Sequence, residues 1–111
     1  MIGSHQPKIM ADFYGKVFGK NPDMEDGDWK GWMVGSCFFG VGAHSEITGM
    51  AKEPQRMIFN LETNEVQGEF ERIKAIGAKV IKEPYEMGPG LIATFEDPDG
   101  NYFQLMTPWK Q

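Results

Sequence analysis

Few residues of this chain carry side chains suited to acid-base, nucleophilic or metal chemistry. The 111 residues include two histidines and one cysteine. His44 stands two positions before Glu46, so this pair could form an unusual metal site, although a solvated loop histidine is the more ordinary interpretation. His5 falls where a helix should begin. Cys37, on an expected strand without a neighbouring histidine, is expected to be a buried structural thiol. We therefore expect no catalytic residue among these groups.

The most informative pattern lies near the end of the chain, where a turn separates two apolar runs. Pro98 presets φ for a turn corner and Gly100 supplies a positive φ, so the segment 92–106 is predicted to be a β-hairpin. Side chains alternate between the two faces of a strand. The predicted face that lines a site carries Tyr102, Gln104 and Met106, and the predicted core face carries Phe103 and Leu105.

The remaining pattern predicts elements in an order that occurs twice. Apolar residues spaced by three and four predict a helix that Ser4 caps, that Pro7 begins and that Gly19 ends. A polar connection over 20–28 follows. The other expected elements are strands over 29–35, 37–41, 56–61 and 78–81, a helix over Val66–Ile76, and loops over 41–54 and 83–90. The order is βαβββ in each half, with a first strand clipped to residues 1–3.

Three segments resemble the glyoxalase/bleomycin resistance/extradiol dioxygenase (vicinal oxygen chelate) superfamily. They are the helix at 12–19 with its Phe13-Tyr14 pair, the strand-helix-strand crossover at 56–80, and the Asp97-Pro98-Asp99-Gly100-Asn101 turn. The resemblance implies an α+β fold of two βαβββ modules, about 1–54 and 55–111, that form a half-open curled sheet in one domain. It also implies a homodimer as the expected assembly.

The resemblance also implies where metal ligands would stand in the metalloenzymes of that superfamily. Those positions match Phe39 (or Gly40 after a slip of one residue), Arg56 and Gln104, while the ligand of the first strand would precede Met1 or is absent. A phenyl ring and a guanidinium donate no lone pair to a metal, and an amide is a poor ligand. We therefore expect neither a metal nor another cofactor. The residues expected to bind a ligand are Arg56, Asn60, Gln104, Phe39, Tyr102, Trp32 and Trp109.

Three functions remain open at this stage. The first is a metal-free small-molecule-binding protein, which could sequester a drug or an aromatic metabolite. The second is a metal-dependent lyase, isomerase or dioxygenase, and the third is a non-catalytic dimeric module without a ligand. The replaced ligand positions favour the first and argue against an enzyme.

The amino-acid composition limits the classes of partner and the compartment that we expect. The net charge of −5 comes with scattered lysines and arginines, so neither nucleic acid nor an anionic membrane surface is an expected partner. A single cysteine excludes an internal disulfide and fits a reducing compartment, so a cytoplasmic location is expected. The chain holds eight Met, eight Phe, three Trp and three Tyr. The plainest interpretation of the methionines is that they fill gaps in the core.

Overall fold

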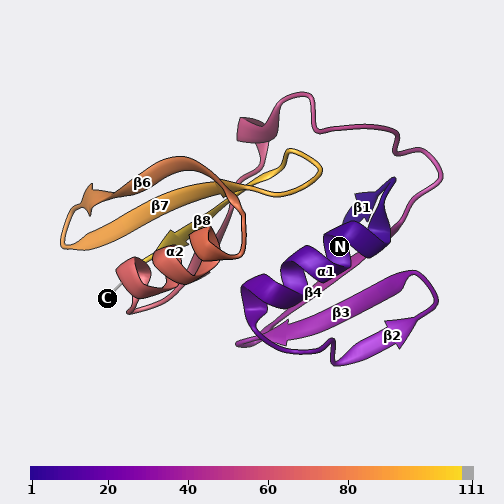
Figure 1. The fold of residues 1–111 in the computed structure, drawn as a ribbon, viewed down its shortest axis with the longest axis horizontal. Coiled ribbons are helices and arrows are strands. Elements are labelled where there is room, and N and C mark those ends of the chain that lie inside the picture. The colour runs from indigo at the N-terminus through magenta and orange to yellow at the C-terminus, as the bar shows by residue number, and fades with distance from the viewer. Residues whose placement is uncertain (109–111) are drawn as a thin grey trace. The chain divides into compact units, whose positions relative to one another are not determined.

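The computed structural model describes residues 1–108, whose strands form two four-stranded sheets (Figure 1). The chain divides into two units, the first covering Met1–Met50 and the second beginning at Ala51. In each unit one α-helix packs against one face of the sheet. We call the opposite face the helix-free face of that sheet. The α+β class and the two-module organisation predicted above are confirmed.

The first unit contains β1 (Ile2–Ser4), α1 (Pro7–Phe18), β2 (Met24–Asp26), β3 (Trp29–Val34) and β4 (Cys37–Ala43). Its strands are ordered β1-β4-β3-β2, and the short β1 runs parallel to β4. Helix α1 ends where expected, because Gly19 adopts φ 71° and donates its N–H to the carbonyl of Gly15. The predicted cap is wrong by two residues: Gln6 is the N-cap, and the Ser4 hydroxyl accepts a hydrogen bond from its N–H.

The second unit contains a 3-10 helix (Pro54–Arg56), β5 (Phe59–Glu62), α2 (Val66–Ala75), β6 (Lys79–Met87), β7 (Gly90–Glu96) and β8 (Tyr102–Met106). Its strands are ordered β5-β8-β7-β6, with β5 parallel to β8. The predicted hairpin is confirmed: the N–H of Asp97 donates to the carbonyl of Asn101, and Gly100 has φ 85°. The Asp97 carboxylate also accepts the N–H groups of Asp99 and Asn101, so this side chain stabilises the turn.

Two predicted boundaries in the second unit are wrong. The segment predicted as a proline-containing loop, 83–90, is mostly strand, because β6 continues through Pro84 to Met87. An edge strand with shifts in register tolerates a proline, since the missing N–H need not reach a partner there. The first strand of this unit starts at Phe59, and Arg56 instead ends the 3-10 helix that precedes it.

Aromatic side chains fill the space between each helix and its sheet. In the second unit the ring of Phe70 on α2 stacks on Phe95, which stacks on Phe103, with centroids 5.2 and 5.6 Å apart. In the first unit Tyr14 on α1 packs against Phe39 at 4.8 Å. The expectation that methionines fill the core is wrong for most of them. Only Met10 is fully buried, whereas the exposed ones are Met1, Met24, Met33, Met50, Met57 and Met87.

Within residues 1–108, neither helix has the length and apolar character needed to cross a lipid bilayer.

Candidate functional site

A row of polar side chains crosses the helix-free face of the second sheet. Phe103 and Leu105 face α2 and are buried, so Gln104 between them points to the other face. Gln104 lies directly across from Asn60 on β5 and from Thr94 on β7. Its Nε2 donates a hydrogen bond of 3.1 Å to Oγ1 of Thr94, a residue only 6% exposed. We call Asn60, Gln104 and Thr94 the amide row.

The amide row is neutral and retains unused hydrogen-bonding groups. Among the described residues, Thr94 is the single hydrogen-bond partner of the Gln104 side chain, and the Asn60 amide makes no hydrogen bond. Oε1 of Gln104, one of its N–H groups and the Thr94 hydroxyl proton are therefore available to a ligand. The expectation that Asn60, Gln104 and Tyr102 share a face agrees with the strand register. That they bind a ligand stays a prediction. Thr94 was not anticipated, although the predicted hairpin already pairs its strand with β8 and could have placed it across from Gln104.

An apolar pocket lies at the end of the same sheet. Ile92 and Met106 form the next cross-strand pair after Thr94 and Gln104 on the helix-free face. The N–H of Leu91 donates to Oγ1 of Thr107 at 3.0 Å, and the N–H of Thr107 donates to the carbonyl of Leu91, which fixes one wall. The cavity measures about 250 Å³. We call it the end pocket, and it is lined by Asn64, Met87, Pro89, Gly90, Leu91, Ile92, Met106, Thr107 and Pro108.

The helix-free face of the first sheet is filled by its own aromatic side chains. The Trp29 indole lies over Gly40 and Gly42, where an added Cβ would stand 3.2 and 2.8 Å from ring atoms. Trp29 also stacks on Phe38, with centroids 5.6 Å apart and planes 20° apart. The position equivalent to Gln104 in this sheet is Gly40, so no side chain corresponds to Gln104 here. Gly40 precedes Val41, the partner of Ile2, as Gln104 precedes Leu105, the partner of Leu61, and Ile2 and Leu61 each stand four residues before the N-cap of the following helix.

The placement of Phe39 on the ligand-binding face is wrong. Its ring packs on the helix side, 4.8 Å from Tyr14, 5.1 Å from Phe18 and 6.5 Å from Trp32. Trp32 was expected near the rim of the site, but it is completely buried in the same cluster. Both residues therefore belong to the core of the first unit.

Arg56 does not reach the amide row along a strand, because it lies outside β5. Its guanidinium forms an ion pair with Glu53 three residues earlier, and its side chain is 72% exposed. Trp109, the remaining residue expected to bind a ligand, lies outside the described residues.

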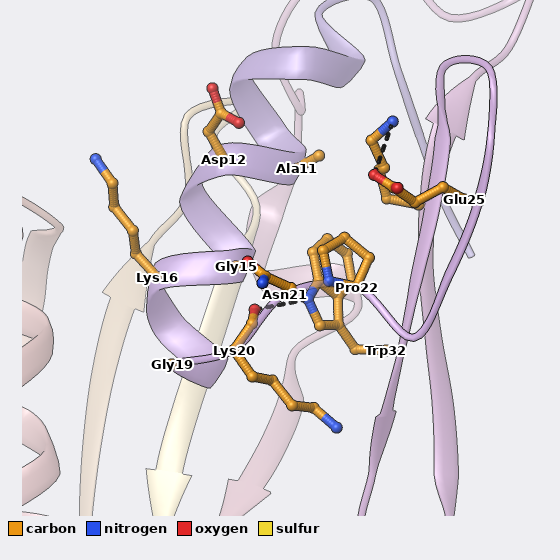
Figure 2. A pocket seen from close by; sticks show the side chains of 11 residues that line it. Ala11, Asp12, Gly15, Lys16, Gly19, Lys20, Asn21, Pro22, Glu25 and Trp32 are labelled. Carbon is orange, nitrogen blue, oxygen red and sulfur yellow. Dashed lines mark hydrogen bonds and ion pairs between the residues drawn. The ribbon is translucent and has the colours of Figure 1, made fainter.

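A second hollow, of about 530 Å³, lies beside α1 in the first unit. Nε1 of the buried Trp32 donates a 3.2 Å hydrogen bond to the carbonyl of Lys20, and both residues line this hollow. Figure 2 shows Asp12 and Lys16 on the outer side of the helix, and the Lys20 ammonium donates to the Met33 carbonyl and to Asp23. Glu25 and Lys30, which also line this hollow, pair with each other at 3.5 Å, so its charged groups do not all converge on one point.

The donor set does not fit a divalent metal ion at the positions that the superfamily resemblance implies. Those positions carry the amide of Gln104, the glycine at 40 and an arginine already paired with a glutamate. Over residues 1–108, no three His, Cys, Asp or Glu side chains gather closely enough to hold a metal ion. His44 instead accepts the N–H of Glu46 at Nδ1, at 3.1 Å. Cys37 is exposed, which corrects the expectation of a buried thiol.

The glyoxalase/bleomycin resistance protein/dioxygenase superfamily model matches residues 2–105 of the chain. A solved glyoxalase/bleomycin resistance protein/dioxygenase family enzyme from Burkholderia phytofirmans is 26% identical, with a TM-score of 0.71 over 96% of this chain and 93% of the other. The fosfomycin resistance protein FosX from Listeria monocytogenes is 17% identical, with a TM-score of 0.68 over 97% and 87%. A hypothetical protein from S. aureus is 21% identical, with a TM-score of 0.77 over 96% and 89%. The last two show likeness of fold only. Among curated proteins, none matches the chain significantly.

Proposed function

The chain belongs to the glyoxalase/bleomycin resistance protein/dioxygenase superfamily, and we propose that it binds a small organic molecule without a resident metal ion. The ligand is placed on the helix-free face of the second sheet, over the amide row. Sequestration of a drug or of an aromatic metabolite is the role that such binding would serve.

The observation that carries this proposal is the chemistry of Gln104. Its amide occupies the strand position that the superfamily resemblance assigns to a metal-binding carboxylate, and Thr94 holds it by a hydrogen bond. A catalytic divalent ion needs about three protein donors that converge on one point. A single amide oxygen gives too few donors, but it is well suited to hydrogen bonding with an organic ligand.

The surroundings of the amide row support binding of an organic molecule. Small-molecule sites are mostly apolar cavities with a few polar groups that fix orientation. The end pocket supplies apolar walls through Met87, Ile92 and Met106, and the amide row supplies the polar groups beside it.

The metal part of the proposal is tested by elemental analysis of protein purified without chelator, together with titration of Mn²⁺, Ni²⁺ and Zn²⁺. We expect less than stoichiometric metal in the wild type. We also expect Gln104→Glu to gain no saturable binding at stoichiometric metal, because one restored carboxylate lacks converging partners. One equivalent of ion retained by the wild type and lost in Gln104→Ala would refute the metal-free function.

The binding part is tested by a thermal-shift screen of uncharged aromatic compounds. A ligand at about one hundred times its Kd should stabilise the fold by about 2.7 kcal/mol. The stabilisation should fall in Gln104→Leu and persist in Gln67→Leu, a control at an exposed glutamine on α2. If nothing in a broad library stabilises the wild type, the chain is not a small-molecule-binding protein of this kind.

A further inference from the structure

We infer that the ligand of the amide row carries an uncharged amide or lactam head joined to a flat apolar body of one or two rings. This inference rests on the proposed function, because it uses the same face of the second sheet. It adds the chemical class of the ligand, a division into two subsites and the residues that select each part.

The residues and the volume of the end pocket indicate the chemistry of the apolar body of the ligand. Six of the residues that line the end pocket have apolar side chains: Met87, Pro89, Leu91, Ile92, Met106 and Pro108. A volume of about 250 Å³ lies below the usual range of about 300–1,000 Å³ for drug-sized ligands, so it suits a smaller group. Thioether side chains adapt to flat rings and make favourable contacts with them. An aromatic or cyclic apolar group is therefore the best occupant.

The distance between the two subsites suits one small molecule. Ile92 precedes Thr94 by two residues, Met106 follows Gln104 by two residues, and both pairs share the helix-free face. Two residues along a strand cover roughly 7 Å. A ring seated over the Ile92–Met106 pair can therefore present a directly attached polar group to the amide row.

The unused hydrogen-bonding groups of the amide row indicate the chemistry of the polar head of the ligand. Gln104 offers its carbonyl oxygen as an acceptor and its second N–H as a donor, next to each other on one planar group. A primary carboxamide or a lactam presents the matching donor and acceptor in the same plane. Two hydrogen bonds can then form without any change in the contact between Gln104 and Thr94.

A charged head is disfavoured because the row contains no countercharge. Moving an ion out of water costs more than neutral amide hydrogen bonds return. The nearest charged side chains on this face belong to Lys82, across from Thr94, and Glu62, across from Met106, which are exposed, and to Glu96, across from Tyr102, which already pairs with Lys79 at 3.4 Å. The Lys82 ammonium lies over the ring of Tyr85, 5.4 Å from its centroid. Such exposed charges are screened and contribute little to binding.

Three probes with the same ring and different heads test the inference: benzamide, benzoate and benzamidinium. The measurement is the titration of protein labelled with ¹³C at the methionine methyl groups, where Met87 and Met106 report on the end pocket. We expect benzamide to shift both signals with a Kd at least tenfold lower than those of the two ions. Toluene, which has the body without the head, should shift the same signals more weakly.

Variants separate the two subsites. Gln104→Leu should raise the Kd of benzamide about three- to tenfold, as expected for a lost neutral hydrogen bond, and should leave the Kd of toluene unchanged. Met87→Glu, at an exposed position that tolerates charge, should weaken both probes. Gln67→Leu should change neither, and the dispersion of its methyl signals shows that the fold is intact.

Benzoate or benzamidinium binding as tightly as benzamide would overturn the inference, and so would shifts confined to methionines outside the end pocket. If the three probes fail while other library compounds still bind in a Gln104-dependent manner, the inference falls and the proposed function stands. If no compound binds at all, both fall.

Discussion

Asp23 joins two segments of the first unit through a single carboxylate. One oxygen, Oδ2, accepts the N–H of Met33 at 2.7 Å and the ammonium of Lys20 at 3.0 Å. These interactions lower the pKa of Asp23 below its ordinary value of 3.8. The hydrogen bond from the Met33 backbone is the largest cause and the Lys20 side chain the next. The charged form of Asp23 therefore stabilises the connection between α1 and β3.

This arrangement predicts a pH-dependent contribution to stability. Because the folded-state pKa is lowered, Asp23 stabilises the fold above its ordinary, unfolded-state pKa of 3.8, and the contribution is lost as the pH falls through the folded-state value. Urea unfolding of Asp23→Asn should show a loss of stability near neutral pH that shrinks below about pH 4. The exposed Asp28→Asn serves as the control. A loss that is constant from pH 7 to 3 would contradict the role of the charge.

Gln104 and Phe39 show what could be predicted from the residues and what could not. Each lies four positions after a turn glycine with positive φ, Gly100 or Gly35, so the two positions looked equivalent. The turn before β8 has five residues, and the turn before β4 has two. A change of one residue in register moves every side chain of a strand to the other face. The predicted face of the strand is therefore right for Gln104 and wrong for Phe39.

At the scale of elements, strands β3 and β4 depend on glycines to accommodate Trp29. Cβ atoms added at Gly31 and Gly42 would approach ring atoms of Phe38 and Trp29 to 2.3 and 2.8 Å, closer than van der Waals contact allows. The sequence shows these glycines but not their purpose, because the indole reaches residues that are distant along the chain. Helix boundaries were easier to predict, since Pro7, Gly19 and Gly77 act locally.

Gly42→Ala should therefore destabilise the first unit by about 1–3 kcal/mol, the usual cost of overpacking. The added methyl must displace the Trp29 ring. When Trp29→Ala is already present, Gly42→Ala should lower the free energy of unfolding much less. The two substitutions should therefore be non-additive in a double-mutant cycle. Chemical denaturation gives the free energies. Gly68→Ala is the matched control, because its Cβ meets open space within helix α2, so it should stabilise by about 0.5–1 kcal/mol. Additive costs would show that the indole does not rest on this glycine.

At the scale of the whole chain, the two units repeat one plan, but they differ in what covers their helix-free faces. Trp29 lies on this face in the first unit, whereas the second unit presents the amide row and the end pocket. The repeat could be predicted from the helix and hairpin motifs, because they are local. The difference could not, since it depends on which side chains meet across strands. The sequence therefore predicts the fold better than it predicts the site.

The exposed apolar side chains bear on the assembly of the whole molecule. Met33 and Phe38 form a cross-strand pair on the helix-free face of the first sheet and are 44% and 40% exposed. A chain of this length buries a limited fraction of its own surface. Apolar side chains that share one exposed face are typical of surfaces that contact a partner. The homodimer expected from the sequence accordingly remains our proposal, with this face as part of its contact.

Light scattering coupled to size-exclusion chromatography tests that proposal. The 12.5 kDa chain should elute with twice its monomer mass at micromolar concentration. Met33→Glu with Phe38→Glu should shift it toward monomer, because each buried carboxylate would lose its hydration without gaining a partner. The exposed Met57→Glu, located in the segment between β4 and β5, should leave the dimer intact. A wild type that is monomeric at 100-fold higher concentration, or a double variant that still dimerises fully, would remove this face from the interface. A monomer that still binds benzamide would further show that the second unit contains a complete ligand site.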